Sequence, residues 1–124
     1  MTIKICLLVT DDPDDHQVIA EALADISENT VLLNILDSQK ALLLLKQQQY
    51  IPHYVFLDLS MQGIKINSIL KEIRKDSETL TIPTMVYGSI ETFLQIENSE
   101  GVIFFDKEYE YPQLREFLKR VFID

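Results

Sequence analysis

Apolar and polar positions along the chain follow two alternating patterns. Short, nearly continuous apolar runs bounded by polar residues are typical of strands buried inside a sheet. Longer stretches in which apolar residues recur every three or four positions are typical of helices that cover such a sheet. The runs at 3–9, 31–36, 54–57, 83–87 and 102–105 are therefore predicted strands, and a helix is predicted after each of them.

The expected helices are defined by their starts and by their inward faces. Asp12 followed by Pro13 is a helix-start signal, because a side-chain oxygen caps the first turn and proline fits its first position. We expect Ser38 to cap a second helix that runs to about residue 49, and a short fourth helix over about 90–98. The inward faces are expected to carry Val18, Ala22, Leu23 and Ile26 in the first helix, Ile66, Ile69, Leu70 and Ile73 in the third, and Leu114, Phe117, Leu118 and Val121 in the last, which opens at Pro112.

Strands that alternate with helices form parallel sheets with helices on both faces, because the crossovers are right-handed. Five such units resemble the flavodoxin-like fold. We therefore predict one α/β domain over residues 1–124, a doubly wound, five-stranded parallel sheet in the order 2-1-3-4-5 with five helices. In such folds ligands bind at the carboxyl ends of the strands, so functional residues are expected just after each strand.

Composition narrows the class of partner and the compartment. Twenty acidic residues against 11 basic ones give a net charge of −9, which disfavours nucleic-acid binding because a phosphate backbone would be repelled. No apolar run is long enough to cross a bilayer, and the first residues lack the pattern of a secretory signal. The lone Cys6 lies in an apolar run and is expected to be a core residue. We therefore expect a cytoplasmic protein without membrane association.

Three charged residues follow predicted strands and are expected at one edge of the sheet. Asp11 comes just after the first strand, Asp58 ends the third, and Lys107 follows the fifth. Two carboxylates and an ammonium group suit a hard divalent cation together with a phosphoryl group. Acids at strand ends also cap the next helix, which is the simpler interpretation of Asp14 and Asp15. It explains Asp58 less well, because no helix start follows that residue directly.

Four segments resemble, in order along the chain, the receiver domains of two-component response regulators. These segments are ICLLV-TDDPDD at 5–15, VFLDLSMQG at 55–63 with ILKEIR at 69–74, IPTMV at 82–86, and FFDK at 104–107. They are similar to the acidic opening, the phosphoacceptor strand with its loop and next helix, the strand before the switch residue, and the aromatic-to-lysine segment of a receiver. The likeness covers nearly the whole chain, and its most specific part surrounds Asp58.

The resemblance implies a role for each of these residues. Asp58 would accept a phosphoryl group from a phosphohistidine on a histidine kinase or a phosphotransfer protein. Asp11 and Asp58 would ligate Mg²⁺ with the backbone carbonyl of Ser60, and Lys107 would pair with the phosphorylated Asp58. Phe104 falls at the aromatic switch position of the family.

The sequence departs from the receiver pattern at three positions. Thr10 stands where receivers have the first of two adjacent acids, so Mg²⁺ binding is expected to be weak. Gly88 stands at the switch position and has no hydroxyl to bind a phosphoryl oxygen, so we expect slow phosphorylation with little conformational response. Glu108 replaces the proline that usually follows the lysine.

Two functions of different kinds remain open from the sequence. The first is a single-domain receiver in a phosphorelay, a protein that is not an enzyme and that signals to a downstream protein partner. The alternative is a pseudo-receiver, a protein-interaction module that works without phosphorylation. A homodimer is a further assembly that the sequence leaves open. A small metal-dependent hydrolase ranks last, because Ser60 stands where a second acid would be needed.

Overall fold

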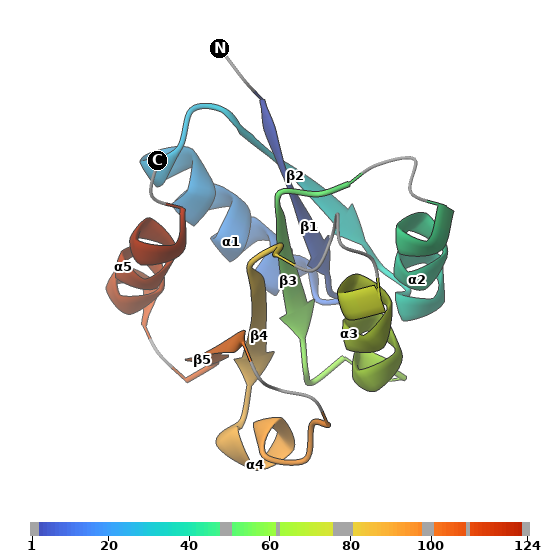
Figure 1. The fold of residues 1–124 in the computed structure, drawn as a ribbon. Coiled ribbons are helices and arrows are strands. Elements are labelled where there is room, and N and C mark those ends of the chain that lie inside the picture. Colours follow the sequence, from blue (N-terminus) through green and yellow to red (C-terminus); the bar gives the residue numbers. More distant parts are fainter. Residues whose placement is uncertain are drawn as a thin grey trace.

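The computed structural model describes residues 3–47, 51–61, 63–75, 81–97, 101–108 and 110–122. Within these residues, five strands form one parallel sheet in the order β2-β1-β3-β4-β5. Five helices surround it, with α1 and α5 on one face and α2 and α3 on the other (Figure 1). The predicted flavodoxin-like doubly wound fold is therefore confirmed.

The order of elements matches the alternation of the sequence. The strands are β1 (Lys4–Val9), β2 (Thr30–Ile35), β3 (Tyr54–Asp58), β4 (Thr84–Gly88) and β5 (Val102–Asp106). The helices are α1 (Pro13–Ile26), α2 (Ser38–Gln47), α3 (Ile66–Lys75), α4 (Ile90–Phe93) and α5 (Tyr111–Val121). The short fourth helix is confirmed, but it ends at Phe93, and residues 94–97, which were expected to continue it, are not helical. The predicted end of the second helix at residue 49 lies outside the described residues.

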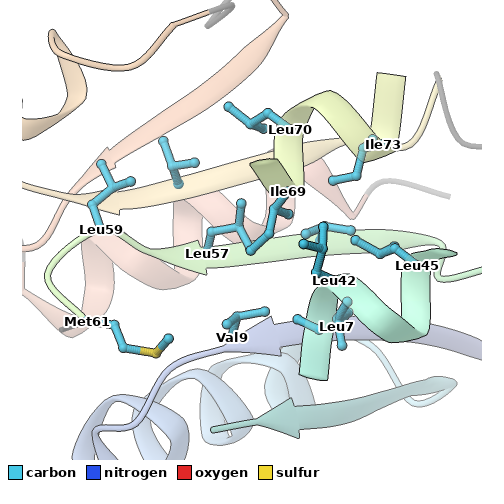
Figure 2. Packing of buried hydrophobic residues seen from close by; sticks show 13 residues of the cluster. Leu7, Val9, Leu42, Leu45, Leu57, Leu59, Met61, Ile69, Leu70 and Ile73 are labelled. Carbon is cyan, nitrogen blue, oxygen red and sulfur yellow. The ribbon is translucent and has the colours of Figure 1, made fainter. Parts of the chain in front are cut away.

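Each face of the sheet carries its own hydrophobic core. Leu7 and Val9 of β1 pack toward α2 and α3, whereas Cys6 and Leu8 pack toward α1 and α5, because successive side chains of a strand point to opposite faces. Every residue of the central strand β3 is buried, since both faces are covered there. Figure 2 shows the core on the face covered by α2 and α3, in which side chains of β1 and β3 contact those of the two helices.

The lone cysteine lies where the sequence predicts it. Cys6 is completely buried, and this burial raises the pKa of its thiol to about 12, so the prediction of a core cysteine is confirmed. Among the helices that the structure describes, none combines the length and the hydropathy needed to cross a bilayer.

The inward face of α1 differs from the predicted one. Val18 is 38% exposed, whereas its neighbour Ile19 is buried together with Ala22 and Leu23. At about 100° per residue, Ile19, Ala22, Leu23 and Ile26 fall within one face that is about 100° wide, and Val18 lies beyond its edge. Once α1 is packed against the sheet, the stripe through Ile19 covers the core and Val18 borders the surface.

The start of α2 is also different from the prediction. Asp37, not Ser38, accepts a hydrogen bond from the backbone N–H of Gln39, at 2.7 Å, and thereby caps this helix. Ser38 is buried as the first residue of α2. Its hydroxyl donates to the Gly63 carbonyl and accepts from the Lys65 N–H, both at 3.2 Å. Ser38, which was expected to cap α2, therefore links α2 to the loop before α3 by hydrogen bonds. Asp12 caps α1 as predicted, accepting from the Asp14 N–H at 2.9 Å.

Candidate functional site

Asp58 lies at the centre of the carboxyl edge of the sheet. It is the last residue of β3, the middle strand, and only 1% of it is exposed. Along β3 its side chain has the same parity as Phe56, so it points to the face that α1 and α5 cover. Thr10, just after β1, shares this parity with Leu8 and is completely buried. The fold thus places these two side chains together, as the strand-end argument requires.

Both carboxylate oxygens of Asp58 already accept hydrogen bonds. Thr10 Oγ1 donates to Oδ2 at 2.8 Å, while the backbone N–H and the hydroxyl of Ser60 donate to Oδ1 at 2.9 and 2.7 Å. A buried carboxylate is stable only where such donors replace the water it has lost. Thr10 therefore does not merely remove an acid from the expected pattern, because its hydroxyl binds Asp58 directly.

Lys107 brings a positive charge to the same carboxylate. Its Nζ lies 2.7 Å from Ser60 Oγ and 3.5 Å from Asp58 Oδ1. Ser60 accepts from the lysine and donates to Asp58, so its hydroxyl relays the interaction between the two charged groups. Partial burial by itself lowers the pKa of Lys107, but the hydrogen bond to Asp15 and the negative charges of Asp58 and Asp15 outweigh it and raise this pKa. Lys107 is therefore an ammonium ion at neutral pH.

Sequence reasoning missed two members of this cluster. Asp15 Oδ2 lies 2.8 Å from Lys107 Nζ, a contact that its place in the first turn of a helix does not predict. The hydroxyl of Tyr87 donates to the same Asp15 oxygen at 3.2 Å. One signal in the sequence could have found Tyr87, because it ends the predicted strand at 83–87 just as Asp58 follows the strand before it. The structure pairs the Cα atoms of Tyr87 and Asp58 across β4 and β3.

Asp11 stands apart from these contacts. It is exposed, and within the described parts of the chain it makes no hydrogen bond or ion pair to the side chains around Asp58. The described residues contain no group of three or more His, Cys, Asp or Glu side chains arranged to hold a metal ion. Asp11, Asp58 and the Ser60 carbonyl are nevertheless oxygen donors of the kind that Mg²⁺ prefers. This donor set fits a weakly held cation, because only two of its members are charged and Asp58 is already engaged.

The side of the site toward α4 is poor in polar contacts. A Cβ atom built on Gly88 would lie 2.8 Å from the Cβ of Leu59, closer than such atoms pack. The backbone of Gly88 has a φ of 158°, which also disfavours a side chain. Leu59 therefore excludes a hydroxyl-bearing residue at the switch position unless the backbone moves. Ser89 does not replace that hydroxyl, because it caps α4 by accepting from the Thr92 N–H at 3.2 Å.

Phe104 packs toward α4 instead of toward Asp58. It is half-buried, and its ring centroid lies 4.7 Å from that of Phe93 in α4.

Two hollows adjoin the site. One, of about 300 Å³, lies between α1 and α5 and is bordered by Asp15, Tyr87 and Lys107. The other, of about 420 Å³, lies beside Ser60, Gly88 and the start of α4.

Comparisons with known proteins place the fold among receivers. No family model matches the sequence, and no curated protein matches it either. The structure is similar to the chemotaxis response regulator CheY4 of Vibrio cholerae, with 21% identity and a TM-score of 0.76 over 97% of this chain and 99% of that one. It is also similar to the bacteriophytochrome response regulator RtBRR, with 22% identity and a TM-score of 0.79 over 99% of this chain and 80% of that one.

A third similar structure was determined with a metal ion. It is the receiver domain of the sensor histidine kinase PA1611 from Pseudomonas aeruginosa PAO1, with a magnesium ion coordinated in its active-site cleft. It shares 20% identity with this chain at a TM-score of 0.70, over 96% of this chain and 97% of that one. The chain therefore has the fold of response-regulator receiver domains.

Proposed function

We propose that this protein is a phosphoaccepting receiver of a two-component relay and that Asp58 is its phosphoacceptor. The observation that carries the proposal is the buried Asp58 carboxylate at the end of the central strand, with the ammonium group of Lys107 held beside it through Ser60. The phosphodonor is a phosphohistidine of a histidine kinase or a phosphotransfer protein. The protein acts in the cytoplasm as a signalling module, without catalytic turnover of a substrate, and passes the signal to a downstream protein.

The proposed reaction is a transfer between two nucleophiles. A carboxylate oxygen of Asp58 forms a bond to phosphorus while the P–N bond to the imidazole breaks, and the electron pair of that bond stays on the imidazole nitrogen, which then takes a proton. The phosphoryl oxygens carry negative charge while the group is transferred to Asp58. Lys107 and the Ser60 hydroxyl are the donors in place to stabilise that charge.

Weak Mg²⁺ binding forms part of this proposal. Asp11, Asp58 and the Ser60 carbonyl would hold the ion, and a bound Mg²⁺ would offset the charge of the phosphoryl group. Thr10→Asp restores the acid that receivers usually carry, so it should tighten Mg²⁺ binding, because a further negative charge acts on the ion at short range. NMR titration with MgCl₂ measures the change. An unaltered affinity would show that residue 10 does not face the ion.

The pseudo-receiver remains the second candidate function, and one observation favours it. Because Leu59 excludes a side chain at Gly88, the hydroxyl that usually reads the phosphoryl group cannot be present in this backbone arrangement. Under this alternative the protein binds its partner through a preformed surface, and Asp58 stays unmodified. A homodimer is compatible with either function.

One experiment separates the two functions. The purified protein is incubated with acetyl phosphate, Mg²⁺ and, separately, a phosphorylated histidine phosphotransfer domain, and modification is followed by intact-protein mass and by ³¹P NMR. A slowly formed acyl phosphate that is absent from Asp58→Asn supports the receiver. If no phosphoryl group is taken up from either donor, the receiver proposal is wrong and the pseudo-receiver is favoured.

A further inference from the structure

Lys107 has two carboxylates within reach, and the nearer one is not the proposed phosphoacceptor. Its Nζ lies 2.8 Å from Asp15 Oδ2 but 3.5 Å from Asp58 Oδ1. The pair with Asp15 is partly shielded from water, since 32% of the Lys107 side chain and 20% of the Asp15 side chain are exposed. Of its two carboxylate partners, the lysine in the resting protein is therefore bound more directly to the one on helix α1.

Asp15 is itself held in place from the sheet. The Tyr87 hydroxyl on β4 donates to the same oxygen that Lys107 contacts, at 3.2 Å. Tyr87 is almost completely buried, and its ring lies 5.3 Å from Lys107 Nζ. Three elements, α1, β4 and the segment after β5, thus meet at one carboxylate. A helix-capping acid would need none of these contacts, and the capping of α1 is already supplied by Asp12.

We propose that Asp15 is a positioning residue that holds Lys107 as the nearer of its two carboxylate partners in the resting protein, and that phosphorylation of Asp58 draws Lys107 from Asp15 to the phosphoryl group. The movement of Lys107 deepens the proposed function of Asp58 and rests on it. The role of Asp15 in the resting protein does not depend on that function, because it is argued from the contacts of Asp15 alone.

Charge decides the direction of this exchange. A carboxylate carries one negative charge, whereas a phosphoryl group carries about 1.5 to 2 near neutral pH together with strong acceptor oxygens. The Coulomb attraction for Lys107 grows in proportion at equal distance. Lys107 is already linked to Asp58 through Ser60, so a short movement completes the transfer.

The exchange of Lys107 between Asp15 and the phosphoryl group is a contact that differs between the resting and the phosphorylated state. Gly88 cannot provide such a contact, because it has no side chain. A phosphoryl group shifts a conformational equilibrium only through interactions that differ between the two states. The Asp15–Lys107 pair exists in the resting state and is lost in the phosphorylated one. The response is therefore expected in the first turn of α1 and at Tyr87, on the face covered by α1 and α5, and not at α4.

The test follows the Lys107 side chain by NMR with ¹³C- and ¹⁵N-labelled lysine, in wild type, Asp15→Asn, Asp15→Glu and Asp14→Asn. Asp14 is a matched control because it lies in the same turn, carries the same charge and is exposed. Asp15→Asn should shift the Lys107 signals and lower the Lys107 pKa, Asp15→Glu should restore both in part, and Asp14→Asn should leave both near wild type. Unchanged Lys107 signals in Asp15→Asn would overturn the inference while leaving phosphorylation of Asp58 untouched.

A second arm adds beryllofluoride as a phosphoryl mimic. In wild type, Lys107, Tyr87 and the α1 first-turn amides should shift together. Asp15→Asn should bind the mimic about two- to fivefold more tightly, because a partly exposed ion pair of modest strength no longer has to break. If wild type binds the mimic while Lys107 keeps its resting signals, the transfer of Lys107 is refuted. If Lys107 depends on Asp15 but no mimic binds, the proposed function fails and the transfer fails with it.

Discussion

The two sides of Asp58 differ in how tightly they are coupled to it. Toward α1, a chain of hydrogen bonds and ion pairs joins Asp58 through Ser60 and Lys107 to Asp15 and Tyr87. Toward α4, Gly88 has no side chain, Ser89 is used as a helix cap, and Phe104 packs on Phe93. Within the described residues, a change at Asp58 therefore has side-chain polar contacts to alter toward α1 and none toward α4. The substitutions below test this contrast, from the largest expected effect to the smallest.

Replacing Lys107 removes the link on which the α1 side depends. Lys107→Met should slow phosphoryl transfer to Asp58 about a hundredfold, since losing one preorganised donor to a developing charge typically costs that much. Single-turnover transfer from a phosphorylated phosphotransfer domain measures the rate. Lys40→Met, which removes an exposed lysine of α2, is the control and should transfer at the wild-type rate. Equal rates in both variants would show that Lys107 plays no part in the transfer.

Restoring the missing switch hydroxyl tests the α4 side. Gly88→Thr should lower the free energy of unfolding by about 1–3 kcal/mol, because its Cβ would meet Leu59 at 2.8 Å and force the packing apart. Urea denaturation measures the loss. Gly63→Ala is a control for backbone conformation alone: the φ of Gly63 is 75°, and a Cβ there has nothing within 4 Å. A stable Gly88→Thr protein with a normal switch response would show that Leu59 yields easily.

Two threonines compare the sides directly. Thr10→Val keeps the shape but leaves Asp58 Oδ2 without its donor and the Asp12 N–H without its acceptor, so it should destabilise the protein by about 1–3 kcal/mol. Thr92→Val, on α4, removes an exposed hydroxyl that contacts only Ser89 Oγ among the described interactions, and should change stability by less than about 0.5 kcal/mol. Thermal unfolding of both variants at the same pH measures the difference. Equal effects would remove the contrast in stability between the two sides.

Phe104 should give the smallest effect on the site. Phe104→Leu removes an aromatic contact with Phe93 and should cost about 0.5–1.5 kcal/mol of stability. The Lys107 NMR signals should stay at their wild-type positions, because no described polar contact joins Phe104 to that lysine. Movement of the Lys107 signals as large as in Asp15→Asn would mean that the α4 side is coupled to Asp58 after all.

Much of the fold could be predicted because the signals that specify it are local. Strand positions follow from apolar runs, and the parallel order follows from the helices between them. The errors lie where tertiary packing chooses between neighbouring residues. Ile19 instead of Val18 faces the core, and Ser38 binds the loop at Gly63 instead of capping its own helix. Both choices depend on where a helix settles against the sheet, which spacing alone does not determine.

The candidate site divides in the same way. That Asp58 and Lys107 converge could be inferred from their places at strand ends. The sequence also determined that Thr10 and Gly88 depart from the receiver pattern, because residue identity needs no structure. Only the tertiary structure decided what those departures mean: Thr10 donates directly to Asp58, Leu59 excludes a side chain at Gly88, and Lys107 binds Asp15 more closely than Asp58. The physical reason is that hydrogen bonds and close contacts depend on distances of a few tenths of an ångström between residues far apart in the chain, whereas strand periodicity needs only neighbours.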